Sequence, residues 1–318
     1  MAQTKRKKSG HPAGKKQHTN PNRLTKPTPA MWVAGARIRT LPLAIAPVAL
    51  GTGAAAAPPF LGSDINWGLV LLSLAVALFL QIGVNYSNDY SDGVRGTDEF
   101  RVGPPRLTGS GVANPKRVLA VALVFFALGA AAGVAIVVIT GQYWLLIPGG
   151  IAIAAAYFYT GGKHPYGYYG LGEVFVFIFF GLVATVGTTY ILTESFNFES
   201  LYAGVAAGAI ACAVLMANNI RDIEQDKVAK KRTLAVLLGQ RGSRIAFVVF
   251  LAVAYAVLLL LSFLFPLAPL VFFTLLLALP ACLIVLTAKT PKELILALKL
   301  TSFTGLLFGV GLALALAY

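Results

Sequence analysis

Charged side chains are scarce in this sequence. Asp, Glu, Lys and Arg make up 12% of the 318 residues, whereas hydrophobic residues make up 57%. Soluble domains carry roughly 25% charged residues. The deficit argues against an ordinary soluble domain and indicates a chain that spends most of its length in a lipid bilayer.

Cysteine is also nearly absent. Cys212 and Cys282 each lie inside an apolar run, and their spacing matches neither a disulfide framework nor a metal site. We expect both to be small packing residues. His164 is a loop residue in our interpretation. The excess of basic over acidic residues, 26 against 12, does not indicate nucleic acid, because the basic residues lie in a tail, in alternate loops and at helix ends.

Acidic residues are missing altogether from the first 28 residues, a polar segment with eight basic residues. No apolar core with a cleavage site follows at signal-peptide length. We therefore predict that residues 1–28 form a disordered, basic cytoplasmic arm and that residues 29–318 form one transmembrane domain. The arm would act as an orientation signal, with contact to anionic lipid as the alternative. Its basic residues are Lys5, Arg6, Lys7, Lys8, Lys15, Lys16, Arg23 and Lys26.

Long apolar runs dominate the rest of the chain. A membrane helix needs roughly 20 mostly apolar residues. Nine runs meet this requirement or fall slightly short of it between strong breakers: 31–57, 67–88, 118–140, 143–160, 170–192, 201–218, 245–265, 268–287 and 294–317. The sequence therefore predicts an all-α integral membrane protein with nine transmembrane helices.

The distribution of basic residues supports this count. With the N-terminus inside, all 26 Lys and Arg residues fall in the arm, in the inside loops or at the inside ends of helices. The predicted outside loops carry Asp64, Glu194 and Glu199 and no basic residue. We predict a cytoplasmic N-terminus, and a pseudo-symmetric bundle in which two four-helix units and one added helix surround a central cavity.

Two similar acidic stretches lie at the inside ends of the second and sixth predicted helices. Residues four apart share a face of a helix, so Asn88 and Asp92 point the same way, as do Asn218, Asp222 and Asp226. Oxygen ligands from carboxylates and amides suit Mg²⁺, which is usually completed by water and substrate phosphates. Two such clusters across one cavity predict a site for magnesium ions, two in our interpretation, and a diphosphate. The alternative is that these residues only solvate helix ends.

Basic residues follow each acidic stretch and provide candidates for phosphate contact. The first loop runs from Arg101 to Gly111 and the second contains Lys231 and Arg232. Charge-assisted hydrogen bonds from such residues neutralise a leaving pyrophosphate, although some of these charges serve orientation alone. In the third inside loop, Tyr159 and Lys163 are four residues apart, and Lys163 could reach the same diphosphate. For Glu173, just inside the fifth helix, a functional role and neutralisation of Lys163 or of a tyrosine cluster remain open.

These motifs resemble those of the UbiA superfamily of intramembrane aromatic prenyltransferases. The family pattern of Asn-x-x-x-Asp with a further acid on helix two matches Asn88, Asp92 and Asp98, and its second pattern matches Asn218, Asp222 and Asp226. The tyrosine and lysine after helix four match Tyr159 and Lys163, and an early arginine matches Arg37 or Arg39. The resemblance covers residues 31–318 and departs from the family at Lys230, where glycine is expected.

Within the superfamily, the two extra residues before Asp98 and the run from Lys231 to Val236 resemble the branch that prenylates 1,4-dihydroxy-2-naphthoate for menaquinone biosynthesis. The resemblance implies a magnesium-dependent transfer from polyprenyl diphosphate to that acceptor, with loss of pyrophosphate and carbon dioxide, giving demethylmenaquinone. It also implies roles for four catalytic residues, Asp92, Asp222, Lys163 and Tyr159. The substrate-binding residues it suggests are Arg37, Arg39, Arg101, Arg221, Lys231 and Arg232.

The setting implied by the resemblance is the cytoplasmic membrane of a bacterium, with surrounding lipid and an active site that faces the cytoplasm. Two alternatives stay open. One is a related enzyme that acts on 4-hydroxybenzoate, homogentisate or haem. The other is a transporter, which usually carries functional charges near mid-membrane on broken helices; here no acidic residue is predicted at mid-span, and the clearest breaks are Pro148 and Pro280. The sequence does not indicate an oligomeric state.

Overall fold

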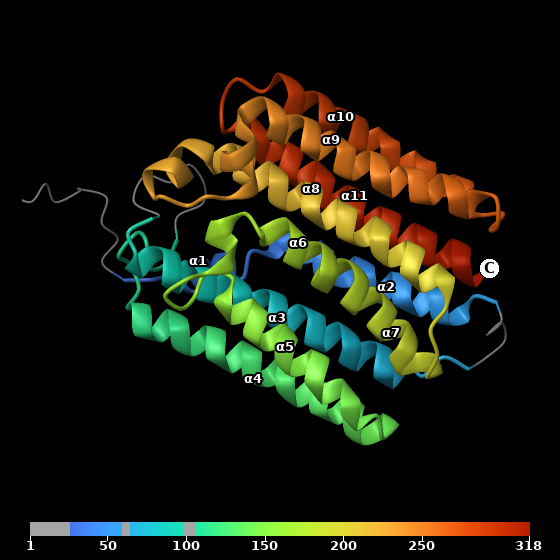
Figure 1. Cartoon of the computed structure of the whole chain (residues 1–318). Helices are drawn as coiled ribbons and strands as arrows, with labels where there is room; N and C mark the ends of the chain where they lie inside the picture. Colours follow the sequence, from blue (N-terminus) through green and yellow to red (C-terminus); the bar gives the residue numbers. More distant parts are fainter. Residues whose placement is uncertain (1–25, 59–63, 98–105) are drawn as a thin grey trace, which may run out of the picture.

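The computed structural model describes residues 26–58, 64–97 and 106–318. Every regular element in these ranges is a helix (Figure 1). The all-α class is therefore confirmed for the described part of the chain. The predicted arm falls largely on residues 1–25, and Asp98 and Arg101 also lie outside the described residues.

The α-helices run in chain order with short 3₁₀ or π segments between them. The α-helices are α1 (Pro29–Gly35), α2 (Pro42–Ala56), α3 (Trp67–Val94), α4 (Pro115–Thr140), α5 (Leu146–Phe158), α6 (Gly172–Val176), α7 (Ala184–Thr193), α8 (Phe198–Val228), α9 (Leu234–Ser262), α10 (Leu275–Thr287) and α11 (Glu293–Ala317). The 3₁₀ segments are η1 (Ile38–Thr40), η2 (Tyr143–Leu145), η3 (Tyr166–Tyr169) and η5 (Ala268–Thr274), and η4 (Phe177–Val183) is a π-helix.

The number of spans that the structure supports is seven or eight. Seven helices in the described ranges are long and apolar enough to cross a bilayer. An eighth span results if Pro29–Thr40 and Pro42–Ala56, which meet at an angle of 46°, are taken together. The remaining predicted span corresponds to the shorter apolar helix Tyr143–Phe158. The count of nine, the pseudo-symmetry and the cytoplasmic N-terminus remain predictions.

Side-chain caps fix where several of these helices begin. The Oδ1 atoms of Asn66 and Asn197 accept backbone N–H groups of the first turns of α3 and α8, at 3.2 and 2.9 Å. Such caps satisfy donors that a helix start leaves without a partner. Because these two helices continue to Val94 and Val228, both acidic stretches lie on their last turns. Both helices therefore extend beyond the predicted ends at residues 88 and 218.

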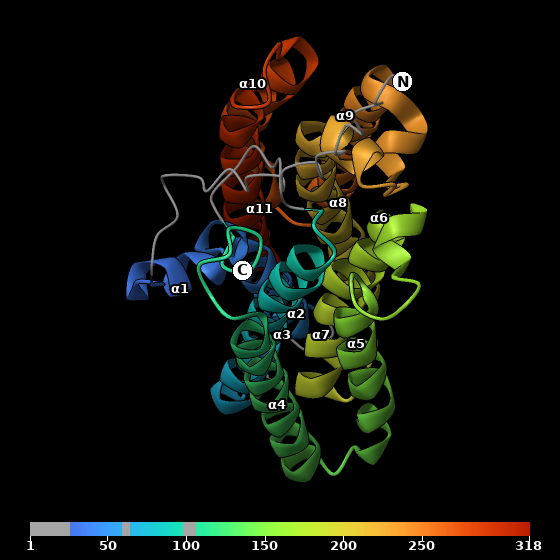
Figure 2. The ribbon, with the colours of Figure 1, turned by 90° about the vertical axis from the view of Figure 1, so that its left-hand side faces the viewer.

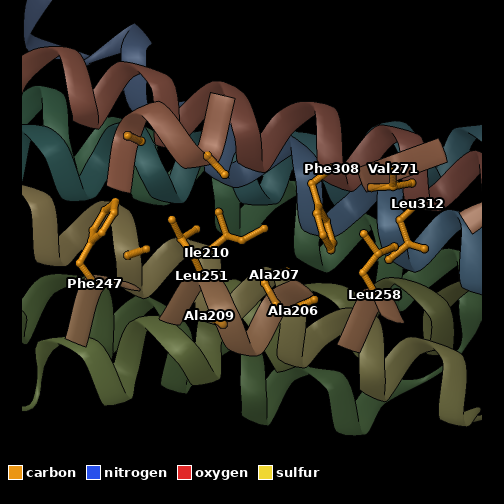
Figure 3. Packing of buried hydrophobic residues seen from close by; sticks show 14 of the residues in the cluster. Ala206, Ala207, Ala209, Ile210, Phe247, Leu251, Leu258, Val271, Phe308 and Leu312 are labelled. Carbon is orange, nitrogen blue, oxygen red and sulfur yellow. The ribbon is translucent and has the colours of Figure 1, made fainter. Parts of the chain in front are cut away.

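The core lies where α8, α9 and α11 meet (Figure 3). Large side chains such as Phe247, Leu258 and Phe308 are fully buried against small residues of α8, including Ala206 and Ala209. In lipid, helices associate through close packing and not through exclusion of water, and small residues allow that close approach. The end-on view shows α9 and α10 at one edge of the bundle and α4 and α5 at the opposite edge (Figure 2).

Candidate active site

A cavity of about 870 Å³ lies between the two acidic stretches. Most of its wall is apolar and comes from α2, α3, α4, α5, α7 and α8, whereas its polar residues include both acidic clusters. A large apolar cavity with a few convergent polar groups is the usual form of a ligand site. The five described residues predicted to bind metal all line it: Asn88, Asp92, Asn218, Asp222 and Asp226.

The α3 cluster is buried at the end of that helix. Asn88 and Asp92 are 6% and 4% exposed. The Thr160 hydroxyl donates a hydrogen bond of 2.7 Å to Asn88 Oδ1, which leaves this oxygen a second lone pair for another partner. Spacings of three and four residues extend the same face toward Asn85 and Gln81, which also line the cavity.

Asp92 is held by three side chains from other segments. The Tyr168 hydroxyl donates to Asp92 Oδ1 at 2.7 Å, and Lys231 Nζ donates to the same oxygen at 2.9 Å. Arg106 Nη1 lies 3.9 Å from Asp92 Oδ2. The Tyr168 ring is also contacted by Lys231 Nζ, 4.7 Å from its centroid, and by the Arg95 guanidinium carbon at 5.4 Å. Burial and the neighbouring Asp92 raise the pKa of the Tyr168 phenol, so it keeps its proton and remains a donor.

The α8 cluster is organised by its own helix end. The Arg221 guanidinium forms a two-pronged ion pair with Asp222, with distances of 2.7 and 2.6 Å. Asp226 accepts a hydrogen bond from the Thr233 hydroxyl at 3.4 Å. The Lys231 backbone N–H donates to the Asp226 carbonyl oxygen at 2.8 Å. This turn after α8 brings the Lys231 side chain back to Asp92 and so joins the two clusters.

The predicted basic residues separate into two groups. Arg37 and Lys231 line the cavity, and Arg221 is buried beside it through Asp222. By contrast, Arg39, Lys163 and Arg232 are exposed and are not among the described cavity-lining residues. Of the alternatives Arg37 and Arg39, the structure thus brings Arg37 to the cavity. The predicted role of Lys163 stays a prediction, and in this structure the lysine that contacts Asp92 is Lys231.

Several residues of the site received little or no weight in the sequence analysis. Arg106 was inside the loop that follows the first acidic stretch, but nothing in its pattern set it above Arg101. Tyr168 and Thr160 belong to a tyrosine- and glycine-rich loop in which spacing alone does not choose one residue. Asp89, which follows Asn88 directly, was given no role from the sequence. It accepts the backbone N–H groups of Leu107 and Thr108, at 2.9 and 2.8 Å, and so anchors the loop that carries Arg106.

Aromatic rings form one side of the cavity. Tyr166 and Phe175 stack with centroids 4.0 Å apart, Tyr159 meets Tyr166 edge-on at 5.5 Å, and Phe179 continues the row at 6.1 Å from Phe175. All four line the cavity, and we refer to them as the aromatic wall. Tyr159 therefore lies at the cavity, and its catalytic role stays a prediction. Such a row can stack on a flat ligand, and its ring faces attract positive charge.

The donor set of the cavity fits a hard divalent cation. The two clusters offer only carboxylate and amide oxygens, the ligands that Mg²⁺ prefers. Across residues 26–58, 64–97 and 106–318, no group of three or more His, Cys, Asp or Glu side chains is arranged to hold a metal ion by itself. Any ion bound here would therefore need further oxygens, and Mg²⁺ commonly takes these from water and substrate phosphate.

Sequence comparison identifies close relatives of the chain. The pattern of the UbiA prenyltransferase family matches residues 44–303. A Mycobacterium tuberculosis protein described as 1,4-dihydroxy-2-naphthoate octaprenyltransferase is 47% identical over 91% of this chain and 97% of its own length. An Escherichia coli protein with the same description is 38% identical over 67% of this chain and 70% of its own length.

Solved structures share the fold at low sequence identity. A UbiA homologue from Aeropyrum pernix, in its apo form, superposes with a TM-score of 0.67 at 16% identity, covering 87% of this chain and 98% of that one. A UbiA homologue from Archaeoglobus fulgidus, bound to GPP and Mg²⁺, gives a TM-score of 0.61 at 16% identity, covering 90% and 99%. The fold of these two structures is therefore shared over most of this chain and over almost the whole length of each solved chain.

Proposed function

We propose that this chain, which belongs to the UbiA prenyltransferase family, transfers a polyprenyl group from its diphosphate to 1,4-dihydroxy-2-naphthoate. The observation that carries the proposal is the meeting of two oxygen-rich clusters, from α3 and α8, at one otherwise apolar cavity. The acceptor is suggested by the relatives described as 1,4-dihydroxy-2-naphthoate octaprenyltransferases. The same descriptions suggest an octaprenyl donor.

The diphosphate of the donor belongs at the polar end of the cavity. Lys231 and Arg106, which lie beside Asp92, are placed to neutralise phosphate oxygens there. Arg37 adds a third positive charge to the cavity lining. Charge neutralisation of the leaving group is the main requirement for heterolysis of an allylic diphosphate.

Magnesium ions, two in our proposal, would be held by Asn88, Asp92, Asn218, Asp222 and Asp226, together with Asp98, which lies outside the described residues. Bound there, they would supply further positive charge for the leaving diphosphate. The UbiA homologue from Archaeoglobus fulgidus bound to GPP and Mg²⁺ supports this cofactor. The apolar wall excludes water, which would otherwise capture the allylic cation, and the aromatic wall offers ring faces to that cation.

Electron counting defines the product. The allylic C–O bond breaks and its electron pair leaves with pyrophosphate. The ring carbon that bears the carboxylate then forms the new C–C bond, and loss of carbon dioxide returns the carboxylate bond pair to the ring. No ring proton is lost in this route. The direct product is therefore the hydroquinone form, and the demethylmenaquinone expected from the resemblance arises by a separate two-electron oxidation.

The test is an acceptor panel with purified protein. One polyprenyl diphosphate is offered with 1,4-dihydroxy-2-naphthoate, 4-hydroxybenzoate, homogentisate or haem, and product masses are measured. We expect a product with the naphthoate only, at a mass that shows loss of carbon dioxide. A product that keeps the carboxylate would refute the decarboxylative route, and turnover of a different acceptor would replace the proposed substrate.

A further inference from the structure

Glu173 is a buried carboxylate for which the proposed reaction has no role. It lies in α6, at the start of a predicted membrane span, and is 4% exposed. Its Oε1 accepts a hydrogen bond of 2.9 Å from Asn219 Nδ2, while Oε2 is buried with no hydrogen-bond partner in the described part of the chain. A carboxylate buried in this way is costly, so its presence points to a function.

The carboxylate dictates how the Asn219 amide is turned. An ionised carboxylate accepts hydrogen bonds and donates none. The NH₂ group of Asn219 must therefore face Glu173, and its carbonyl oxygen is left as the group available to the cavity that Asn219 lines. A glutamine at position 173 would not impose this choice, because it can pair with either end of the amide.

Asn219 stands at the border between the apolar and polar parts of the cavity. Ala211 and Leu215 precede it at four-residue spacing on α8 and line the apolar part. Asn218 and Asp222 on the adjoining face belong to the oxygen-rich cluster. This border is where the reactive carbon of a donor lies when its diphosphate is at the clusters and its tail is in the apolar part.

The aromatic wall approaches the same place. The place that a Cβ would take at Gly172 is 3.5 Å from the Tyr159 hydroxyl and 3.4 Å from a methyl carbon of Leu215, so Tyr159 and α8 both lie beside the start of α6. Glu173 follows directly in the chain. A flat acceptor ring that stacks on the aromatic wall would therefore bring its edge to Asn219.

Building on the proposed function, we propose that the Asn219 carbonyl accepts a hydrogen bond from the 4-hydroxyl of 1,4-dihydroxy-2-naphthoate, and that Glu173 is the positioning residue that aims it. The 4-hydroxyl is the free donor of this acceptor, because the 1-hydroxyl can bond internally to the adjacent carboxylate. It is also meta to the carbon that is prenylated, so the contact orients the ring without activating it. Asn219 thus contributes to acceptor choice.

The test compares two acceptors, 1,4-dihydroxy-2-naphthoate and 1-hydroxy-2-naphthoate, which lacks the 4-hydroxyl. Asn219→Ala should lower kcat/KM for the first about tenfold, mainly through KM, and change that for the second less than about twofold. Glu173→Gln should lower the ratio of kcat/KM for 1,4-dihydroxy-2-naphthoate to that for 1-hydroxy-2-naphthoate by about threefold. The effect is smaller than for Asn219→Ala because one of the two ways in which glutamine can pair with the Asn219 amide still leaves the Asn219 carbonyl toward the cavity. The KM for the prenyl diphosphate should stay unchanged in both variants.

A matched control is Ser73→Ala, which changes another buried polar residue of the cavity lining, almost twenty residues before Asp92 on α3. It should leave the acceptor ratio unchanged. Equal losses for both acceptors in Asn219→Ala, or a changed KM for the diphosphate, would overturn the inference while the wild-type activity upheld the proposed function. A wild-type protein that does not prenylate 1,4-dihydroxy-2-naphthoate would overturn both.

Discussion

Asp92 shows what sequence reasoning can and cannot supply for a single residue. Its spacing from Asn88 predicted a shared helix face, and the structure places both at the cavity. The partners of Asp92 were not predictable, because Tyr168, Arg106 and Lys231 come from three loops whose folding depends on contacts distant in sequence. The same limitation directed attention to Lys163, which spacing favoured but which is exposed here.

Asp92→Asn tests the oxygen cluster at the scale of one residue. The amide has nearly the same shape but no charge, so it weakens cation binding and its pairing with Lys231. We expect kcat to fall by about 100-fold or more and the magnesium concentration for half-maximal activity to rise. Steady-state turnover over a magnesium titration measures both. Normal turnover after removal of magnesium by EDTA would contradict the assignment.

Asp89→Asn tests a carboxylate with a structural role, three residues before the proposed metal ligand Asp92. Asp89 is 2% exposed and accepts two backbone N–H groups with its two carboxylate oxygens. Asparagine has one such oxygen and turns a donor toward the other N–H, which should cost about 1–3 kcal/mol of stability. Thermal unfolding in detergent would show the loss. The exposed Asp64→Asn should change stability by no more than about 0.5 kcal/mol, and equal stability of the two variants would contradict the prediction.

At the scale of elements, the sequence predicted the positions of helices better than their internal geometry. Hydropathy predicted a span over 170–192, close to the observed Gly172–Thr193, but it gave no sign that Phe177–Val183 is a π-helix. Such segments are rare and often occur at functional sites. Phe179, Phe180 and Val183 of this segment all line the cavity. The position of this segment beside the cavity depends on its close contact with α8, which no local pattern in the sequence reveals.

Gly181→Ala tests that contact. A Cβ at this position would lie 2.6 Å from the Gly204 carbonyl oxygen and 2.6 Å from the Gly208 Cα. Both are backbone atoms that cannot move aside alone, so we expect a loss of about 1–3 kcal/mol in stability. Gly187→Ala is the matched control, because nothing lies within 4 Å of its added Cβ. Unfolding in detergent compares them, and equal midpoints would refute the proposed close packing.

Across the whole molecule, basic residues of the site and acidic residues of the predicted outside loops lie at different ends of the helix bundle. The basic residues that contact the site, including Arg106 and Lys231, lie at the end of the bundle where α3 and α8 finish. The acidic Glu194 and Glu199 lie where α7 ends and α8 begins. Helix packing fixes this separation of charge, but the membrane face that each end meets is a property of insertion. The prediction of which end faces the cytoplasm therefore rests on the positive-inside rule.

Reporter fusions test the orientation of the chain together with the parity of the spans that follow Lys163. Figure 1 places α1 and the chain end Tyr318 at opposite ends of the bundle, as an odd number of spans requires. Green fluorescent protein fused after Lys163 should fluoresce and alkaline phosphatase there should be inactive, because that loop is predicted to be cytoplasmic. After Tyr318 the two reporters should give the reverse result. The same result at both sites would contradict the odd number of spans between Lys163 and Tyr318, and a reversal at both would place the site on the outer face.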